Sequence, residues 1–297
     1  MSIADEIKQS FKSGNNLIKL IYINIGVWLA VQLVKIFFFL FAVPVDQVNF
    51  ISWFAVPAHF SSLVTKPWTV FTYMFLHEDF LHILFNMLWL YFLGRIFLQY
   101  LDEKKLLSVY ILGGLTGALI YILAFNIFPV FDQIVTVSYA LGASASVMAV
   151  VVAIAVYAPD YNIYIWLISS ITGPIKLKWI AVFTILIDLL SIPSSNSGGH
   201  IAHLGGAIFG VIYILQYRKG KNIASGFDRF MDNIFSVFRR RKNRIKVTYH
   251  RPVTDYDFKM KKKEEQDEID RILDKIAQGG YDSLTKAEKE KLFRAGK

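Results

Sequence analysis

The chain has 297 residues, of which 55% are hydrophobic, and a formal net charge of +9 at pH 7. It contains no cysteine, which excludes a thiol nucleophile, disulfides and cysteine-ligated zinc. The hydrophobic residues form long runs rather than a repeat of 2 or 3.6 residues, a pattern typical of membrane-spanning helices. Much of the positive charge follows residue 217, which indicates a tail on the inner side of a membrane and not a surface for nucleic acid.

Six apolar runs are candidates for membrane spans, because about 20 helical residues cross about 30 Å of hydrocarbon. The runs cover residues 17–43, 80–100, 106–125, 142–157, 175–192 and 199–217. The fourth run is near the lower limit of length. The expected fold is all-α, a polytopic membrane protein with six transmembrane helices and a helical cytoplasmic tail. We expect residues 1–220 to form the membrane domain and residues 221–297 to form the basic tail.

Lysine and arginine are unevenly divided between the two sides of these spans. The segments 44–79, 126–141 and 192–198, which would share one side, hold only Lys66. The other side carries several basic residues, among them Lys104. The positive-inside rule therefore places both termini in the cytoplasm and the start of the fourth span at the outer face. We expect a multi-pass membrane protein.

Residues 44–79 are apolar but contain Pro44, Pro57 and Pro67, which disfavour a long helix. The aromatic residues of this segment, such as Trp68, favour an outer loop that is partly embedded in the membrane. An ordinary surface loop is the alternative.

An amphipathic helix is predicted soon after the last span. Phe227, Phe230 and Ile234 recur at intervals of three and four, and the basic run 239–242 follows them. This pattern favours a helix on an anionic membrane surface. A helix that packs on the membrane domain explains the same apolar face equally well.

A helical hairpin is predicted near the C-terminus. Its first helix has one apolar face and ends at Gly279 and Gly280, as glycines commonly end helices. Thr285 and Glu288 have the spacing of a capping box, which predicts the start of a last short helix.

Ser144 opens the fourth span after Gly142 and Ala143. Serine in a membrane helix usually bonds a backbone carbonyl and performs no chemistry. Here the small neighbours allow a tight entry into the helix, whose N-terminus supplies unpaired N–H groups suited to an oxyanion. Ser146 lies about 200° around the helix and points elsewhere. Ser144 is therefore a candidate nucleophile.

His203 lies within the sixth span, where an ionisable residue is costly and is a functional candidate by default. Gly206 and Gly210 share its helix face and let another helix backbone come close. A neutral histidine there can accept the proton of a serine and return it to a leaving group. The alternative is a packing face with a buried histidine. His200, one turn earlier, is interpreted as a rim residue.

His82 and Asn86 are four residues apart and share a face of the second span. An imidazole N–H and an amide NH₂ are suitable donors for a tetrahedral oxyanion. The zinc motif H-E-x-x-H is excluded because its second histidine would fall on Leu81. His77 is five residues from His82, so we assign it to organising the outer loop. We predict no metal and no cofactor.

These residues resemble the motifs of the rhomboid intramembrane serine proteases. The motifs are His77-x4-His82-x3-Asn86, Gly142-x-Ser144 and Ala202-His203-x2-Gly206-x3-Gly210, within residues 17–217. The resemblance implies that Ser144 is the nucleophile and His203 the general base of a dyad. It also implies an oxyanion hole made by His82, Asn86 and the backbone N–H of Ser144. Family members cleave transmembrane segments of other membrane proteins near their outer ends.

The chain departs from the family pattern in two places. Ala145 replaces the glycine that commonly follows the serine, which could narrow the pocket, and Thr69 follows Trp68 where many members have arginine. Asp188 is a further intramembrane charge. Because the family uses a dyad, we interpret Asp188 as a structural hydrogen-bond partner and not as catalytic.

The sequence therefore predicts a rhomboid-type serine endopeptidase that acts on transmembrane segments. The resemblance and the compactness of the chain imply a bacterial inner membrane, and an organelle membrane is the alternative. The alternative is a non-proteolytic relative that binds membrane-protein helices, which loss of Ser144 or His203 would favour. A transporter would show internal repeats, which we do not find. The expected partners are transmembrane substrates and the lipid bilayer, with anionic lipid at the tail, and no nucleic acid. Nothing in the sequence specifies the oligomeric state.

Overall fold

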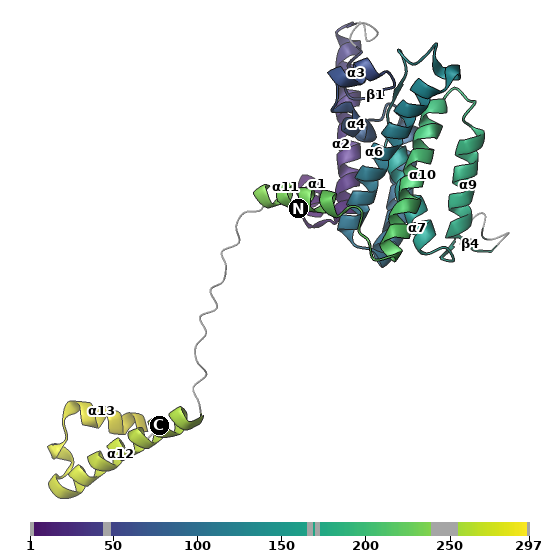
Figure 1. The fold of residues 1–297 in the computed structure, drawn as a ribbon. Coiled ribbons are helices and arrows are strands. Elements are labelled where there is room, and N and C mark those ends of the chain that lie inside the picture. The colour runs from purple at the N-terminus through teal and green to yellow at the C-terminus, as the bar shows by residue number, and fades with distance from the viewer. Residues whose placement is uncertain (1–2, 44–48, 165–168, 170–172, 239–254, 296–297) are drawn as a thin grey trace. The chain divides into compact units, whose positions relative to one another are not determined.

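The computed structural model describes residues 3–43, 49–164, 169, 173–238 and 255–295 (Figure 1). The chain divides into two compact units, Met1–Phe238 and Arg239–Lys297. We call the first the membrane unit and the second the C-terminal unit.

Long helices dominate the membrane unit, and most of them run side by side (Figure 1). The longer helices are α1 (Ile3–Ser13), α2 (Asn16–Leu40), α5 (Phe80–Tyr100), α6 (Glu103–Ile127), α7 (Ser144–Tyr157), α9 (Leu177–Leu190), α10 (Ser197–Arg218) and α11 (Ser225–Phe238). A helix lies at each of the six predicted spans, so the all-α prediction is confirmed for the described residues.

Four of these helices, α2, α5, α6 and α10, are long and apolar enough to cross a membrane. The protein is therefore a multi-pass membrane protein. The helices α7 and α9 have 14 residues each. A helix of that length is about 21 Å long, shorter than the hydrocarbon core of a typical bilayer. The prediction of six full spans is thus supported at four places, while α7 and α9 are shorter than predicted.

The starts of α2 and α6 have clear local causes. The side chains of Asn15 and Asp102 each accept a backbone N–H from the first turn of the helix that they precede, at 3.1 and 2.9 Å. The Glu103 carboxylate accepts the backbone N–H of Asn16 at 2.7 Å and joins the two helix starts.

The segment between α2 and α5 contains only short elements within its described residues. They are η1 (Phe50–Trp53), β1 (Val56–Pro57), α3 (Phe60–Thr65), α4 (Thr69–Thr72) and η2 (Tyr73–Phe75). The predicted absence of a long helix is confirmed for residues 49–79. The rings of Trp53 and Trp68 stack at 6.4 Å, and the Trp68 indole N–H donates to the Trp53 carbonyl at 2.8 Å. Pro44 and the four residues after it lie outside the described residues.

The remaining connections are also short. η3 (Pro129–Phe131) and β2 (Tyr139–Ala140) join α6 to α7, and β3 (Asn162–Ile163) pairs with β4 (Ile175–Lys176) between α7 and α9. β1 and β2 are antiparallel, with Val56 opposite Ala140. This pairing ties the loop before α5 to the segment that leads into α7.

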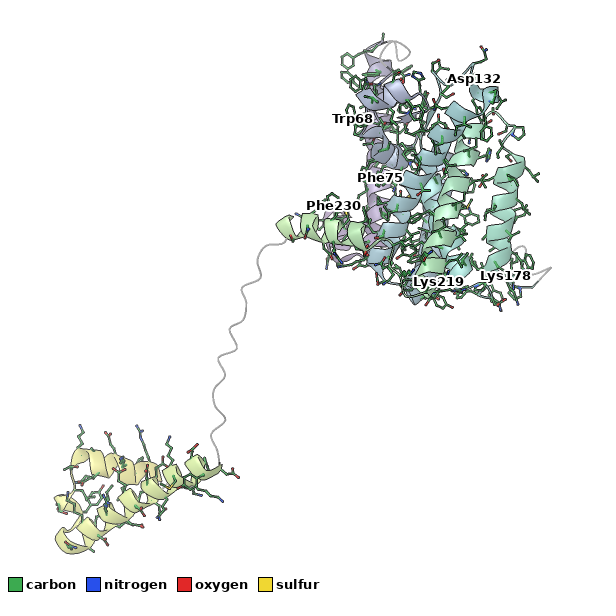
Figure 2. The ribbon with its side chains drawn as sticks, viewed as in Figure 1. Trp68, Phe75, Asp132, Lys178, Lys219 and Phe230 are labelled. Atoms are coloured by element: carbon green, nitrogen blue, oxygen red, sulfur yellow. The ribbon has the colours of Figure 1, made fainter. Side chains whose placement is uncertain are left out.

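Two lysines mark one end of the membrane unit. Trp68 and Asp132 lie toward one end, whereas Lys178 and Lys219 lie at the other (Figure 2). This arrangement matches the uneven division of basic residues in the sequence.

The helix α7 packs between α6 and α10 through small residues. A Cβ atom added to Gly210 would lie 2.5 Å from the Ala149 carbonyl oxygen and 3.0 Å from the Ala153 nitrogen. A Cβ added to Gly206 would overlap the carbonyl oxygen of Ala145. Only glycine at these two positions lets the backbones of α7 and α10 touch, as the shared face of Gly206 and Gly210 predicted.

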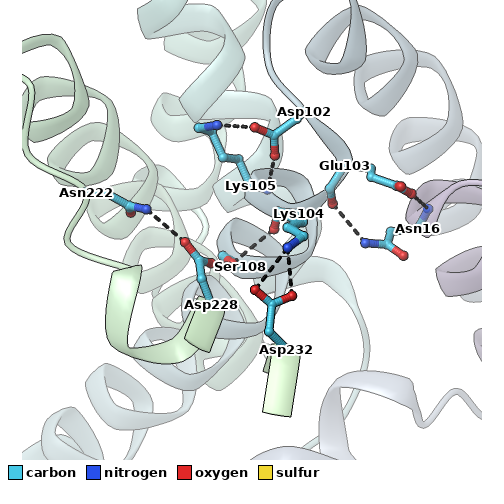
Figure 3. Close-up of polar contacts among 9 residues, drawn as sticks. All are labelled: Asn16, Asp102, Glu103, Lys104, Lys105, Ser108, Asn222, Asp228 and Asp232. Atoms are coloured by element: carbon cyan, nitrogen blue, oxygen red, sulfur yellow. Dashed lines mark hydrogen bonds and ion pairs between the residues drawn. The ribbon is translucent and has the colours of Figure 1, made fainter. Parts of the chain in front are cut away.

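The helix α11 packs against the N-terminal end of α6 through polar contacts (Figure 3), and its Phe227 packs against the hydrophobic core of the membrane unit. The Lys104 ammonium donates to both carboxylate oxygens of Asp232, at 2.7 and 3.0 Å. Asp228 accepts hydrogen bonds from the Ser108 hydroxyl and from the Asn222 amide. These contacts group α11 with the membrane unit, which extends to Phe238.

The C-terminal unit is a helical hairpin of α12 (Asp255–Gly279), η4 (Tyr281–Ser283) and α13 (Lys286–Ala295). The end of α12 at Gly279 and Gly280 is confirmed, and Gly280 has a φ of +73°. The capping box is confirmed as well, since the Thr285 N–H donates to Glu288 Oε2 at 2.7 Å. This N–H and the Lys275 ammonium lower the pKa of the Glu288 carboxyl to about 2.

The contact between α7 and α10 gives a first prediction. Gly210→Ala should lower the free energy of unfolding by about 1–3 kcal/mol, the usual cost of overpacking a core, because the new methyl meets backbone atoms of α7. Gly26→Ala in α2 is the matched control, since an added Cβ there meets no heavy atom within 4 Å. Thermal unfolding in detergent micelles measures both. Equal melting temperatures for Gly210→Ala and wild type would contradict the packing described above.

Candidate active site

Ser144 is the first residue of α7. The preceding Gly142 has a φ of +123°, which L side chains rarely adopt, and its N–H donates to the Tyr73 carbonyl at 2.9 Å. A Cβ added to Gly142 would lie 2.7 and 2.8 Å from two ring atoms of His82. Glycine therefore brings the turn before Ser144 against His82. The N–H of Ser144 belongs to the first turn of α7, where N–H groups have no partner within the helix.

His77 supports this turn from the other side. Its side chain is fully buried, and its Nε2 accepts the backbone N–H of Ala143 at 3.3 Å. The rings of His77 and His82 meet edge to face with centroids 5.0 Å apart. His77 thus holds the residue directly before Ser144, a role closer to the site than the loop-organising role expected from the sequence.

His203 is oriented by a carboxylate from the neighbouring helix. Its Nδ1 lies 2.8 Å from Oδ1 of Asp188, which is 5% exposed in α9. An ionised carboxylate can only accept, so the Nδ1 of His203 carries the proton. In the neutral ring, Nε2 is then free to accept a proton.

Asp188 also binds His200. The His200 Nδ1 lies 2.8 Å from the same Oδ1 atom. The expectation of a structural hydrogen-bond partner is confirmed, but sequence reasoning did not identify the partners. The spacing of His200 and His203 was the available signal, because residues three apart share a helix face.

One cavity brings the predicted site residues together. It has a volume of about 420 Å³ and is lined by Ser144, His203, His82, Asn86 and Asp188, with apolar side chains around them. These five residues come from four helices, α5, α7, α9 and α10. Within the described residues Ser144 and His203 form no hydrogen bond with each other, and such bonds are often loose in the absence of substrate.

Asn86 lies on the cavity side of α5. It is 7% exposed, and its amide donates one N–H to the His82 carbonyl at 2.9 Å. An amide has two such N–H groups, so one more can point at a ligand. Asn86 and His82 therefore can supply donors beside Ser144.

Ala145, the residue that departs from the family pattern, lies away from the cavity. It is 1% exposed, and a Cβ added to Gly117 of α6 would be 2.7 Å from the Ala145 Cβ. Ala145 is not among the residues that line the cavity. Its methyl group fills the contact with α6 and does not narrow the cavity beside Ser144.

Comparisons with known proteins identify the family of the chain. The Rhomboid domain model matches residues 64–220, and residues 254–295 match a family of unknown function, DUF6576. The mitochondrial RHOMBOID-like protein 12 of Arabidopsis thaliana is 29% identical over 162 residues, covering 52% of this chain and 47% of that protein. The chain thus spans about half the length of this relative. Because the domain model covers more than half of the chain and includes Ser144, His203, His82 and Asn86, the chain belongs to the Rhomboid family.

Proposed function

We propose that this protein is an intramembrane serine endopeptidase that cleaves transmembrane segments of other membrane proteins. One observation supports the proposal most directly. A single cavity is lined by Ser144 and His203 and also by His82 and Asn86, although these residues come from three separate helices. A nucleophile, a base and oxyanion donors around one space are the components of acyl transfer.

The reaction would begin with attack of the Ser144 hydroxyl on a peptide carbonyl. The serine proton passes to Nε2 of His203, and the tetrahedral oxyanion accepts hydrogen bonds from Asn86, His82 and the Ser144 N–H. His203 then gives the proton to the leaving amine, which releases the first product. Water then attacks the carbonyl of the acyl-enzyme. His203 takes the proton of this water and gives it to the Ser144 oxygen, which releases the second product.

Asp188 acts as a positioning residue in this scheme. Its hydrogen bond fixes the His203 proton on Nδ1 and leaves Nε2 as the acceptor. The same carboxylate stabilises the imidazolium that forms when His203 takes the serine proton. The dyad is therefore assisted by a third group that acts through His203.

The substrate class follows from the surroundings of the cavity. Apolar side chains such as Phe85, Trp89 and Met148 line most of it. An apolar segment of a membrane protein suits these walls, and the polar groups at one end suit its peptide bonds.

The proposed orientation places both termini in the cytoplasm. The basic residues Lys178 and Lys219 gather at one end of the membrane unit, and α7 begins from the opposite end. A bacterial inner membrane fits this orientation, but the relative from Arabidopsis is mitochondrial and gives no support for a bacterial membrane.

Removal of the nucleophile is the test of this function. Ser144→Ala should reduce cleavage of a single-span substrate by a factor on the order of 10⁶, which is below detection. Ser146→Ala is the matched control, because Ser146 is buried against Met74 and does not line the cavity. Gel assays in liposomes measure both variants. Equal cleavage by wild type and Ser144→Ala would contradict the proposal, and no cleavage of any substrate by wild type would favour the binding-only alternative.

The positioning role of Asp188 gives a separate prediction. Asp188→Asn should lower kcat by about 10²–10⁴-fold with little change in KM, because an amide can donate to Nδ1 and move the ring proton to Nε2. Steady-state kinetics measure the two parameters, and the melting temperature monitors folding. An unchanged kcat in the folded variant would exclude this role.

We also propose that anionic lipid binds near α11. Phe230 is exposed on this helix, and the basic run 239–242 follows it in the sequence. Binding of a peptide of residues 221–297 to vesicles with anionic lipid should weaken as salt rises from about 0.05 to 0.5 M, because salt screens charge attraction. Binding that salt does not change would contradict this proposal.

A further inference from the structure

Asp188, His200 and His203 form a cluster that the proposed reaction uses only in part. One ring nitrogen of each histidine and one Asp188 oxygen lie within 4.8 Å of one another. Each imidazole is 2.8 Å from the same oxygen atom. Among the described residues this is the one group of three histidine or acidic side chains whose ligand atoms meet in this way. His200 contributes to the group but does not line the cavity.

The donor set is one that transition metals prefer. Two imidazole nitrogens and one carboxylate oxygen are common ligands of zinc, and three protein ligands leave a fourth position for water. Zinc bonds of about 2.1 Å in a tetrahedral site keep donor atoms about 3.4 Å apart. Small side-chain movements from the observed arrangement would give this spacing. The spacing of residues in the sequence could not show the cluster, because Asp188 lies on another helix.

Charge and access also favour a cation. With neutral imidazoles the cluster carries the single negative charge of Asp188, and no lysine or arginine pairs with this carboxylate in the described part of the chain. The side chains of His200 and His203 are each 19% exposed, so a metal ion can reach both of them. A divalent cation would thus enter a site that offers one negative charge and no positive competitor.

We infer that this cluster is an inhibitory site for Zn²⁺, bound by Nδ1 of His200, Nδ1 of His203 and the Asp188 carboxylate. The inhibitory part of the inference rests on the proposed protease function. A ring whose Nδ1 binds the metal keeps its proton on Nε2, so the proton moves from one nitrogen to the other with no net release. The Nε2 of His203 then donates instead of accepting. The base that would take the Ser144 proton is blocked.

Direct metal binding tests the site without any need for activity. Full-length Ser144→Ala protein, purified in detergent without a polyhistidine tag, is titrated with Co²⁺ as a spectroscopic probe and then with Zn²⁺ as competitor. We expect the visible bands of tetrahedral cobalt at saturation with one equivalent, and their loss on addition of zinc. Absence of a saturable equivalent would overturn the inference.

Two second-site variants in the Ser144→Ala background assign the ligands. His200→Gln should weaken cobalt binding by at least about tenfold, a loss that even outer-shell changes produce. His59→Gln is the matched control, since His59 lies at the start of α3 and bonds Ser61. Its affinity should match that of the parent protein. Equal affinity in His200→Gln and His59→Gln would overturn the inference.

An activity measurement separates this inference from the proposed function. Zn²⁺ should slow cleavage by the wild-type protein at least about tenfold at saturation, since the base is blocked, and a chelator should restore the rate. The ratio of rates with and without zinc should approach one in His200→Gln. Absence of all cleavage by the wild-type protein without zinc would contradict the proposed function. The cobalt titration would still test whether the cluster binds a metal ion. Cobalt binding without zinc inhibition of an active enzyme would overturn the inhibitory role.

Discussion

The close approach of α7 to α10 is the constraint on which the site depends. Gly206 and Gly210 place the backbone of α10 directly against the carbonyl groups of Ala145 and Ala149. Because Ser144 precedes Ala145, and His203 lies one turn before Gly206, this contact brings both residues to one cavity. Larger side chains at the glycines would separate the helices and with them Ser144 and His203. The packing of small residues therefore also sets the geometry of the proposed reaction.

A second constraint is that polar side chains buried inside the membrane unit need hydrogen-bond partners. Asp188 is buried and would be costly without partners, and two histidines donate to it. His77 is buried as well and accepts a backbone N–H of the turn before Ser144. Each of these contacts satisfies a buried polar group and also holds a residue of the site. The stability of the fold and the proposed catalysis thus depend on the same hydrogen bonds.

The sequence was sufficient for features that depend on local pattern. Apolar runs located all six helices, and the capping pair Thr285 and Glu288 marked the start of α13. The sequence was insufficient to predict contacts between elements that lie far apart along the chain. The partners of Asp188, the support from His77 and the direction of the Ala145 methyl depend on how helices turn against each other. The apolar face of α11 did not reveal which of its residues meet the membrane unit. Phe227 packs against the core and Phe230 is exposed. The polar contacts to α6 could not be read from the sequence.

The central claim is that Ser144 is a nucleophile activated by His203. Reaction of the full-length protein with a fluorophosphonate, followed by mass spectrometry of its peptides, tests this claim most directly, because the reagent bonds to activated serines. The account predicts a single adduct on Ser144 in the wild-type protein and its loss in His203→Ala. An adduct on another serine, or equal labelling of Ser144 in both proteins, would contradict it.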